Sequence, residues 1–303
     1  MVRWDSGNGE LKKRFVQFLK NKRRPAKDER NIRNMLSYLD RYMPSEGISR
    51  PEEVFDMFMR CEHGRHHLDR AFRNLLNFYR RVLGYPRDFI EALKEAIPAA
   101  RGDFEDKWVP SEDLIIQSLR ELRDKHVKSF VFLNAQLDCP TRPMHLAEML
   151  ESFDPVRLER TDKGFYKYRL GIERGTKHAW VIYLTSYTAE LLLKLYERGQ
   201  RITYSSVDNW LKKHAKRITR PDGKEATMPL RPKYVRKFTM NMMRRAGLDK
   251  DVVQFLAGEK PKGVDERHYL DLELLADNQY ERYMAYLAEL RAKAGLIVTS
   301  GQD

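Results

Sequence analysis

Basic residues, a glycine and a tyrosine follow one another in a definite order within residues 230–271. Lys233-Tyr-Val-Arg236 stands at the start of an expected helix, Gly258 ends a second expected helix, and Tyr269 comes eleven residues after Gly258. Another arginine, Arg142, lies upstream in the context Thr-Arg-Pro, a typical helix start. The combination of two arginines, a lysine and a tyrosine is suited to chemistry on an anionic substrate.

These residue types fit the reaction of a phosphodiester. A phosphorus centre under attack gathers negative charge, and guanidiniums such as those of Arg142 and Arg236 can bond its non-bridging oxygens in pairs. A tyrosine oxygen, here that of Tyr269, is a competent nucleophile for phosphorus and a moderate leaving group. The departing 5′-oxygen needs a proton, which Lys177 in an expected hairpin turn can supply, with Lys167 as the alternative. Such a reaction needs no metal and no other cofactor.

The composition points to a polyanionic partner. The chain has 303 residues and a formal net charge of +13, and segments 1–100 and 201–260 carry the excess of Lys and Arg. Only two cysteines are present, which excludes a disulfide framework and a multi-cysteine zinc site, so we expect no metal. No apolar run is long enough to span a bilayer and no secretory signal is visible, so we expect a soluble intracellular protein.

The elements that must position these residues are mostly helical. Apolar residues recur at helical spacing through residues 1–98, and we expect a small helical domain there, followed by a linker over 99–109. Residues 110–303 are expected to form a second domain that ends in a long helix. Alternating residues at 166–172 and 178–184 predict a β-hairpin, so the predicted fold class is mainly α with a small antiparallel β-sheet (α+β).

Taken in order, these motifs resemble the tyrosine recombinase (phage-type integrase) family. Members carry an arginine after a turn, a hairpin lysine, a [His/Lys]-x-x-Arg box, a Gly-[His/Trp/Arg] dipeptide and a tyrosine shortly afterwards. The resemblance covers roughly residues 110–290, and Lys-x-x-Arg with a short interval from glycine to tyrosine looks most like integrases of archaeal viruses and plasmids. It implies an N-terminal core-binding domain, a catalytic domain, and cleavage of DNA through a 3′-phosphotyrosine.

The resemblance also implies a catalytic set with one irregular position. It comprises Tyr269, Arg142, Arg236, Lys233, Lys177 and Lys260. Lys233 stands where the family usually has histidine. Glu259 follows Gly258 where the family has His, Trp or Arg, and a carboxylate there would repel a phosphate, so we expect Lys260 to act instead. Arg267 and His268 are alternative residues for this contact with the phosphate. The departure at Glu259 also leaves open that the chain is a catalytically inactive relative of the family.

Double-stranded DNA is the expected partner. We expect the two basic segments to form the halves of a clamp around the duplex. In the helical domain the candidate DNA-binding residues are Arg73, Arg80, Arg81, Lys12 and Lys20. The resemblance implies that the protein forms a homo-oligomer, a tetramer, on DNA and that the free protein is a monomer. It also implies that the protein lies in the cytoplasm, on the nucleoid.

Several alternatives stay open on the sequence. Type IB topoisomerase-like relaxation uses the same chemistry without pairing two sites, and a DNA-binding regulator could use the same fold without catalysis. Tyr280, Tyr283 and Tyr286 compete with Tyr269 as nucleophile, although their helical spacing favours packing. The helix over 272–294 could dock on a neighbouring protomer or pack within its own chain.

Overall fold

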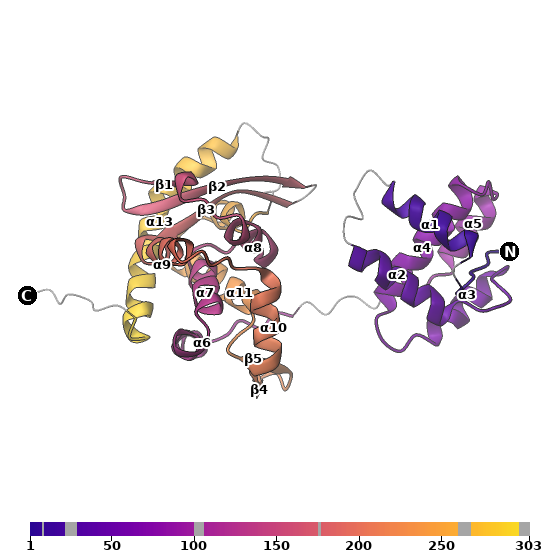
Figure 1. Cartoon of the computed structure of the whole chain (residues 1–303), viewed down its shortest axis with the longest axis horizontal. Helices are drawn as coiled ribbons and strands as arrows, with labels where there is room; N and C mark the ends of the chain where they lie inside the picture. The colour runs from indigo at the N-terminus through magenta and orange to yellow at the C-terminus, as the bar shows by residue number, and fades with distance from the viewer. Residues whose placement is uncertain (8, 22–28, 100–105, 175–176, 260–267, 297–303) are drawn as a thin grey trace, which may run out of the picture. The chain divides into compact units, whose positions relative to one another are not determined.

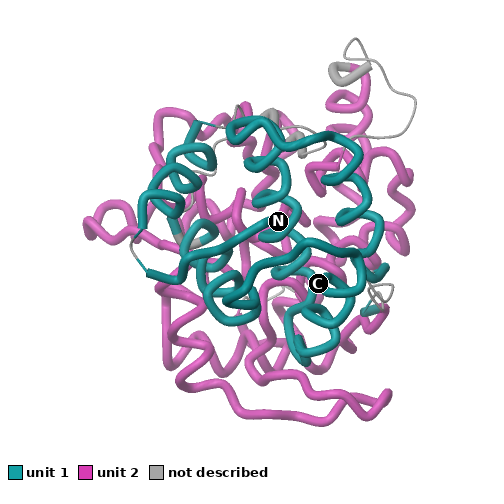
Figure 2. Tube along the Cα trace, turned by 90° about the vertical axis from the view of Figure 1, so that its right-hand side faces the viewer, with its two compact units in different colours: residues 1–106 teal, residues 107–303 magenta. Residues whose placement is uncertain are grey.

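The chain divides into two compact units, Met1–Asp106 and Lys107–Asp303 (Figure 2). The structure is a computed structural model, and it describes residues 1–7, 9–21, 29–99, 106–174, 177–259 and 268–296. Between them, the described residues confirm the predicted fold class, because helices predominate and the strands form small antiparallel sheets.

The first unit is helical. Its helices are α1 (Glu10–Lys20), α2 (Glu29–Tyr42), α3 (Pro51–Met59), α4 (Arg65–Arg81) and α5 (Arg87–Glu95). Helix α4 is central, since it packs against α1, α2 and α5, and its apolar face is fully buried (Figure 1). The basic residues of α4 stand on the other face, as expected for an amphipathic helix. Sequence reasoning did not identify α5.

The second unit surrounds helix α7. Its helices are α6 (Glu112–Lys125), α7 (Val127–Asp138), α8 (Pro143–Glu151), α9 (Ser186–Glu197), α10 (Tyr204–His214), α11 (Pro232–Arg245), α12 (Lys250–Leu256) and α13 (His268–Lys293), with a 3-10 turn at Pro155–Arg157. Every residue of α7 from Ser129 to Asp138 is buried. It contacts α6, α8, α9, α10, α11 and α13, and Figure 1 shows it enclosed among them.

Two antiparallel sheets complete this unit. The larger has the order β1 (Leu158–Arg160), β2 (Phe165–Arg174) and β3 (Lys177–Thr185), and the smaller pairs β4 (Lys216–Thr219) with β5 (Glu225–Met228). The predicted hairpin corresponds to β2 and β3, whose register shifts between Arg169 and Ile172. Gly171 takes a positive φ of 62° inside this shift, a backbone conformation that favours glycine.

Helix α13 packs against its own chain. Tyr280, Tyr283, Leu287 and Leu290 are buried in the core of the second unit, and the helix contacts α6, α7 and α12. Most of the apolar residues of this helix are therefore used within the protomer, whereas Leu274 and Leu275 are exposed.

Candidate active site

Arg142 projects from a rigid connection between two buried helices. Helix α7 ends at Asp138, and the amide of Gln136 donates hydrogen bonds to the carbonyls of Cys139 (3.1 Å) and Thr141 (2.8 Å), which fixes the turn. Pro143 then starts α8, with Arg142 as its N-cap residue. This fold of the backbone leaves the Arg142 side chain about one quarter exposed.

Arg236 reaches the same place from helix α11. Its Nε donates to the carbonyl of Pro140 at 2.7 Å, immediately before the turn that carries Arg142. Its Nη2 donates to the carbonyl of Ala257 at 3.2 Å and to Oε1 of Glu259 at 2.7 Å. The guanidinium is thus held on both sides, by the turn after α7 and by the end of α12.

The C-terminus of α12 organises both arginines. Gly258 has a φ of 67°, the amide of Gly258 bonds the carbonyl of Phe255, and the amide of Glu259 bonds the carbonyl of Gln254. These are the two hydrogen bonds of a Schellman motif, which ends a helix with a left-handed glycine. The turn leaves the carbonyl of Gly258 outside the helix, and this carbonyl accepts a hydrogen bond from Nη1 of Arg142. The backbone conformation at this position favours glycine.

The carboxylate of Glu259 lies against both guanidiniums. Its Oε1 is 2.7 Å from Nη2 of Arg236 and 4.0 Å from Nη2 of Arg142. Burial and the neighbouring positive charge of Arg236 lower the pKa of Arg142, and the negative charge of Glu259 opposes that shift. Arginine remains charged at neutral pH even so, because its ordinary pKa is far higher. The site is two positive charges held beside one negative charge.

Tyr269 is placed only through its backbone. It is the second residue of α13, and its side chain lies outside the described part of the structure. The competing tyrosines are occupied: Tyr280 and Tyr283 are fully buried and donate to the carbonyls of Asp138 and Leu137, each at 2.8 Å. Burial also raises the pKa of both phenols well above its ordinary value. They have a packing role, which leaves Tyr269 as the candidate nucleophile in this segment.

Tyr286 is also engaged elsewhere. Its hydroxyl donates to Oε2 of Glu112 at 2.9 Å, and burial together with this carboxylate raises the pKa of the phenol. Glu112 in turn bonds Lys293 at 2.8 Å, so this cluster joins α6 to the C-terminal part of α13.

The candidate lysines are placed to different degrees. Lys233 is exposed in the first turn of α11, with its ammonium 4.4 Å from the ring centre of Tyr234. Lys177 is the first residue of β3 and is paired in register with Arg174, but its side chain is outside the described part. Lys260 lies outside the described residues altogether.

Lys167, the alternative to Lys177, has a structural role. It is buried, and its ammonium bonds Glu273 at 3.0 Å and Asp277 at 2.5 Å, both on α13. Arg169 adds a second cation to Glu273 at 3.0 Å. The helix that carries Tyr269 is therefore fixed to β2 one turn after the tyrosine. Sequence reasoning missed this set, because only tertiary packing brings these charges together.

The candidate DNA-binding residues of the first unit fall into two groups. Three are paired with carboxylates: Lys12 with Asp40, Arg73 with Asp69 and Arg80 with Glu91. Lys20 and Arg81 are exposed at the ends of α1 and α4, and they form no ion pair with the described residues. They are the most available of the five for a new contact.

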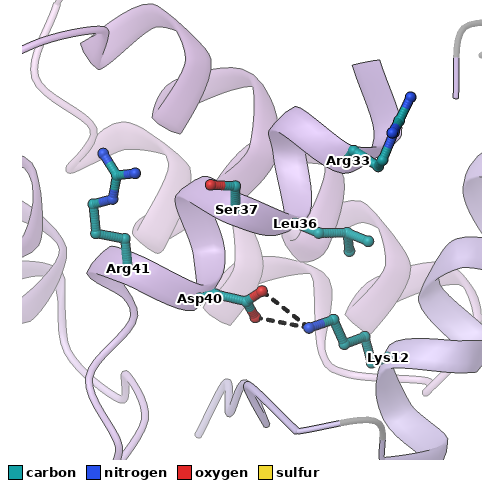
Figure 3. Close-up of a pocket in the computed structure, with 6 residues that line it drawn as sticks. All are labelled: Lys12, Arg33, Leu36, Ser37, Asp40 and Arg41. Atoms are coloured by element: carbon teal, nitrogen blue, oxygen red, sulfur yellow. Dashed lines mark hydrogen bonds and ion pairs between the residues drawn. The ribbon is translucent and has the colours of Figure 1, made fainter. Parts of the chain in front are cut away.

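A shallow pocket lies beside Lys12 on the first unit. It has a volume of about 410 Å³ and is lined by Lys12, Arg33, Leu36, Ser37, Asp40 and Arg41 (Figure 3). Figure 3 shows the ammonium of Lys12 turned to both oxygens of Asp40, each at 3.0 Å. Arg33 and Arg41 of α2 were not recognised from the sequence, although their exposure and charge suit phosphate contacts.

The second unit also has a basic hollow next to the box of α11. It has a volume of about 290 Å³ and is lined by Arg217, Glu225, Ala226, Thr227, Arg231, Lys233 and Tyr234. The β4–β5 hairpin forms one side, and the start of α11 forms the other. This adds Arg217 and Arg231 to the cations close to Lys233.

The described residues provide neither a metal site nor a membrane span. They contain no group of three or more histidines, cysteines or acidic residues that could hold a metal ion. None of the described helices is both long and apolar enough to cross a membrane.

Comparison with known proteins identifies the family to which the chain belongs. A search of curated proteins finds no match to the chain. The family model described as archaeal phage integrase matches residues 107–286, which is more than half of the chain and contains Arg142, Arg236 and Tyr269. The chain therefore belongs to the archaeal phage integrase family.

Proposed function

We propose that this DNA-binding integrase is a site-specific recombinase of the tyrosine type. The observation that carries the proposal is the convergence of Arg142 and Arg236 on the two carbonyls that follow α12, those of Gly258 and Ala257. Two guanidiniums from distant parts of the chain meet where they can bind the oxygens of one phosphate together. Removing such a charged donor from a transition state typically costs a factor of about 10² to 10³ in rate.

The proposed reaction has two balanced steps. The oxygen of Tyr269 attacks phosphorus and loses its proton to water, the bond from phosphorus to the 5′-oxygen breaks, and that oxygen takes a proton from Lys177. The product is a 3′-phosphotyrosine and a free 5′-hydroxyl. In the second step the 5′-hydroxyl of another strand attacks the same phosphorus and returns a proton to Lys177, while the bond from phosphorus to the tyrosine oxygen breaks and that oxygen takes a proton from water. Lys233 and Lys260 are proposed to bond phosphate oxygens, and no cofactor takes part.

The proposed organisation follows from the two basic segments. Residues 1–98 act as the core-binding domain, 99–109 as a linker, and 110–303 as the catalytic domain. Lys12, Lys20, Arg73, Arg80 and Arg81 contact the phosphate backbone, and four protomers assemble on paired DNA sites. The face of α13 that packs within its own chain is not available for contacts between protomers. The protein works in the cytoplasm, on the nucleoid.

A suicide substrate tests the nucleophile. A nick just beyond the cleavage site lets the short 5′-hydroxyl fragment diffuse away, so the covalent adduct accumulates and can be mapped by peptide mass. The wild-type chain is expected to give an adduct on Tyr269, and Tyr269→Phe none. Tyr286→Phe is the matched control on the same helix, since its hydroxyl is bound to Glu112. An adduct on another residue would refute the assignment, and no adduct from the wild type would favour a DNA-binding regulator.

Supercoiled plasmids separate recombination from relaxation. A recombinase gives products in which two sites are joined. The rate of that reaction depends on protein concentration in the way expected for an oligomer. A type IB topoisomerase relaxes a plasmid with one site as efficiently as a plasmid with two. Relaxation without any two-site product would replace the proposal by this alternative.

A further inference from the structure

The two arginines of the site already hold an anion of this chain. Glu259 lies within hydrogen-bonding distance of Arg236 and within ion-pair distance of Arg142. The side chains of Arg236 and Arg142 are only about one fifth and one quarter exposed, so each is partly removed from water. Two like charges in such a setting repel each other unless a negative charge lies between them. Among the described residues, Glu259 is the carboxylate that hydrogen-bonds Arg236 and also forms an ion pair with Arg142.

The position of Glu259 is fixed by its backbone and not by its side chain. Its amide closes the Schellman motif of α12 through the carbonyl of Gln254, at 2.9 Å. The carboxylate is joined to that backbone by rotatable bonds and is about one third exposed. The carboxylate can therefore turn away while the end of the helix stays in place.

The arginines keep other partners when the carboxylate leaves. Arg236 retains the carbonyls of Pro140 and Ala257, and Arg142 retains that of Gly258. These neutral acceptors orient the guanidiniums but carry no full negative charge. An incoming phosphate would find two positioned cations, provided that Glu259 no longer occupies the space.

We propose that Glu259 occupies the phosphate position in the DNA-free protein and is exchanged for the scissile phosphate when DNA binds. This inference rests on the proposed function, because it takes the two arginines as the phosphate site. A carboxylate and a phosphodiester both carry negative charge, so they cannot share one pair of guanidiniums without strong repulsion. The exchange makes Glu259 a competitor that belongs to the protein itself.

The competitor affects specificity. A bare pair of arginines binds any phosphate of any duplex, because phosphate contacts carry no sequence information. With Glu259 in place, a phosphate enters only where the remaining contacts of the protein with DNA make up for displacing it. Glu259 thus lowers affinity for isolated anions and for weakly held DNA, and it favours occupation of the site within a fully engaged complex.

Inorganic phosphate is the probe that tests exchange without requiring cleavage. Its affinity for the full-length protein is measured by calorimetry or by the rise in Tm with phosphate concentration. Glu259→Gln keeps the size of the side chain and removes the charge, and it is expected to bind phosphate about tenfold more tightly. Glu259→Ala is expected to do the same, which guards against a folding defect in one variant.

Two controls assign the effect to this position. Glu121→Gln removes the same charge from the same unit, where Glu121 pairs with Lys125 on α6, and it is expected to leave phosphate affinity within about twofold because its effect is screened. In an Arg236→Ala background, Glu259→Gln is expected to give no gain, since the competitor has lost its main partner. Equal gains from Glu121→Gln and Glu259→Gln would show a general charge effect and overturn the proposal.

The outcomes separate this inference from the proposed function. If the wild type forms the Tyr269 adduct but Glu259→Gln binds phosphate no more tightly, the exchange is wrong and the recombinase assignment stands. If Glu259→Gln binds phosphate more weakly, Glu259 orients the arginines and the exchange is again wrong. If Glu259→Gln raises the affinity for phosphate but no adduct ever forms, Glu259 is supported as a competitor of phosphate and the proposed cleavage reaction is wrong.

Discussion

Nη2 of Arg291 lies 2.5 Å from Oδ1 of Asp138, and both side chains are buried. The other donors of Arg291 bond Asn134 at 3.1 Å, Thr185 at 2.8 Å and Thr188 at 2.9 Å. The second oxygen of Asp138 accepts from the amide and the hydroxyl of Thr185. The pair is therefore fully hydrogen-bonded, and it ties the end of α13 to α7.

Replacing Arg291 by Met is expected to destabilise the second unit by about 3–5 kcal/mol, because Asp138 would keep a buried charge without a partner. The free energy of unfolding is measured by urea denaturation of the full chain, following the transition of this unit. Arg282→Met is the control on the same helix, since Arg282 is exposed and, within the described part of the chain, its side chain donates to the carbonyl of Gly247. A loss below about 1 kcal/mol for Arg291→Met would contradict a buried charged pair.

Arg236→Lys is expected to slow formation of the covalent adduct by a factor of about 10² to 10³, since lysine keeps the charge but not the planar fork. The affinity for DNA should change little, because the other phosphate contacts remain. Single-turnover cleavage of the suicide substrate gives the rate. Arg244→Lys on the same helix, which bonds the carbonyl of Leu248, should cleave at the wild-type rate. Similar losses in both variants would speak against a special role for Arg236.

Gly258→Ala is expected to cost about 1–2 kcal/mol of stability, because its φ of 67° is in the left-handed region. It should also weaken phosphate binding, since the carbonyls that orient the arginines move. Gly295 is a matched control: its φ is 71°, it ends α13 with the same pair of hydrogen bonds, and its Cβ would meet open space. Gly295→Ala should show the same loss in Tm with unchanged phosphate affinity. If both variants bind phosphate normally, the α12 terminus does not position the site.

The contacts of α13 with β2 predict sensitivity to acid. Burial raises the pKa of Glu273, but Arg169 and Lys167 outweigh it, and the net pKa is lowered. A carboxylate with a lowered pKa stabilises the fold above its ordinary pKa of 4.5, and this stability is lost as the pH falls through the folded-state value. Glu273→Gln should therefore be less stable than the wild type at pH 7 and converge with it in acid. Tm measured from pH 7 to pH 3 tests this, and parallel curves would exclude it.

Lys20 and Arg81 are expected to contribute more to DNA affinity than Arg73. The double variant Lys20→Gln/Arg81→Gln should reduce the slope of log K against log salt by about 0.9 per lost phosphate contact. Arg73→Gln should reduce it less, because Arg73 already pairs with Asp69 in the free protein. The affinity for a non-specific duplex at several salt concentrations gives the slopes. Equal salt slopes for the wild type and all of these variants would show that these residues do not contact DNA.

Local patterns were enough for much of the fold. The alternation at 166–172 and 178–184 predicted the β2–β3 hairpin, and the helical phase of Tyr280 and Tyr283 correctly favoured packing over chemistry. Strands β4 and β5 escaped notice because each has four residues, and the first follows the basic end of α10 without a break in helical character. Helix α5 was missed because it is short and immediately follows a turn.

The site was less accessible to sequence reasoning. The motifs indicated Arg142 and Arg236, but their meeting depends on a left-handed turn at Gly258 and on the buried turn after α7. Glu259 was recognised as unfavourable for a phosphate. That it bonds the arginines themselves follows only from tertiary structure, because no spacing rule connects residue 259 to residue 142. The catalytic roles of Arg142, Arg236 and Lys233 stay predictions, as do those of Tyr269, Lys177 and Lys260.

The burial of α7 has a consequence for the timing of site assembly. Arg142 stands just after a helix whose residues from Ser129 onward are buried, so we expect its turn to open only when the unit unfolds. Exchange of the Cys139 amide, which donates to the carbonyl of Ala135, should match the slowest amides of the protein. Arg142 is thus preorganised in the DNA-free protein. The free energy of DNA binding therefore does not include an entropy cost of ordering this residue. Any adjustment on binding falls to the side of the site that carries Glu259.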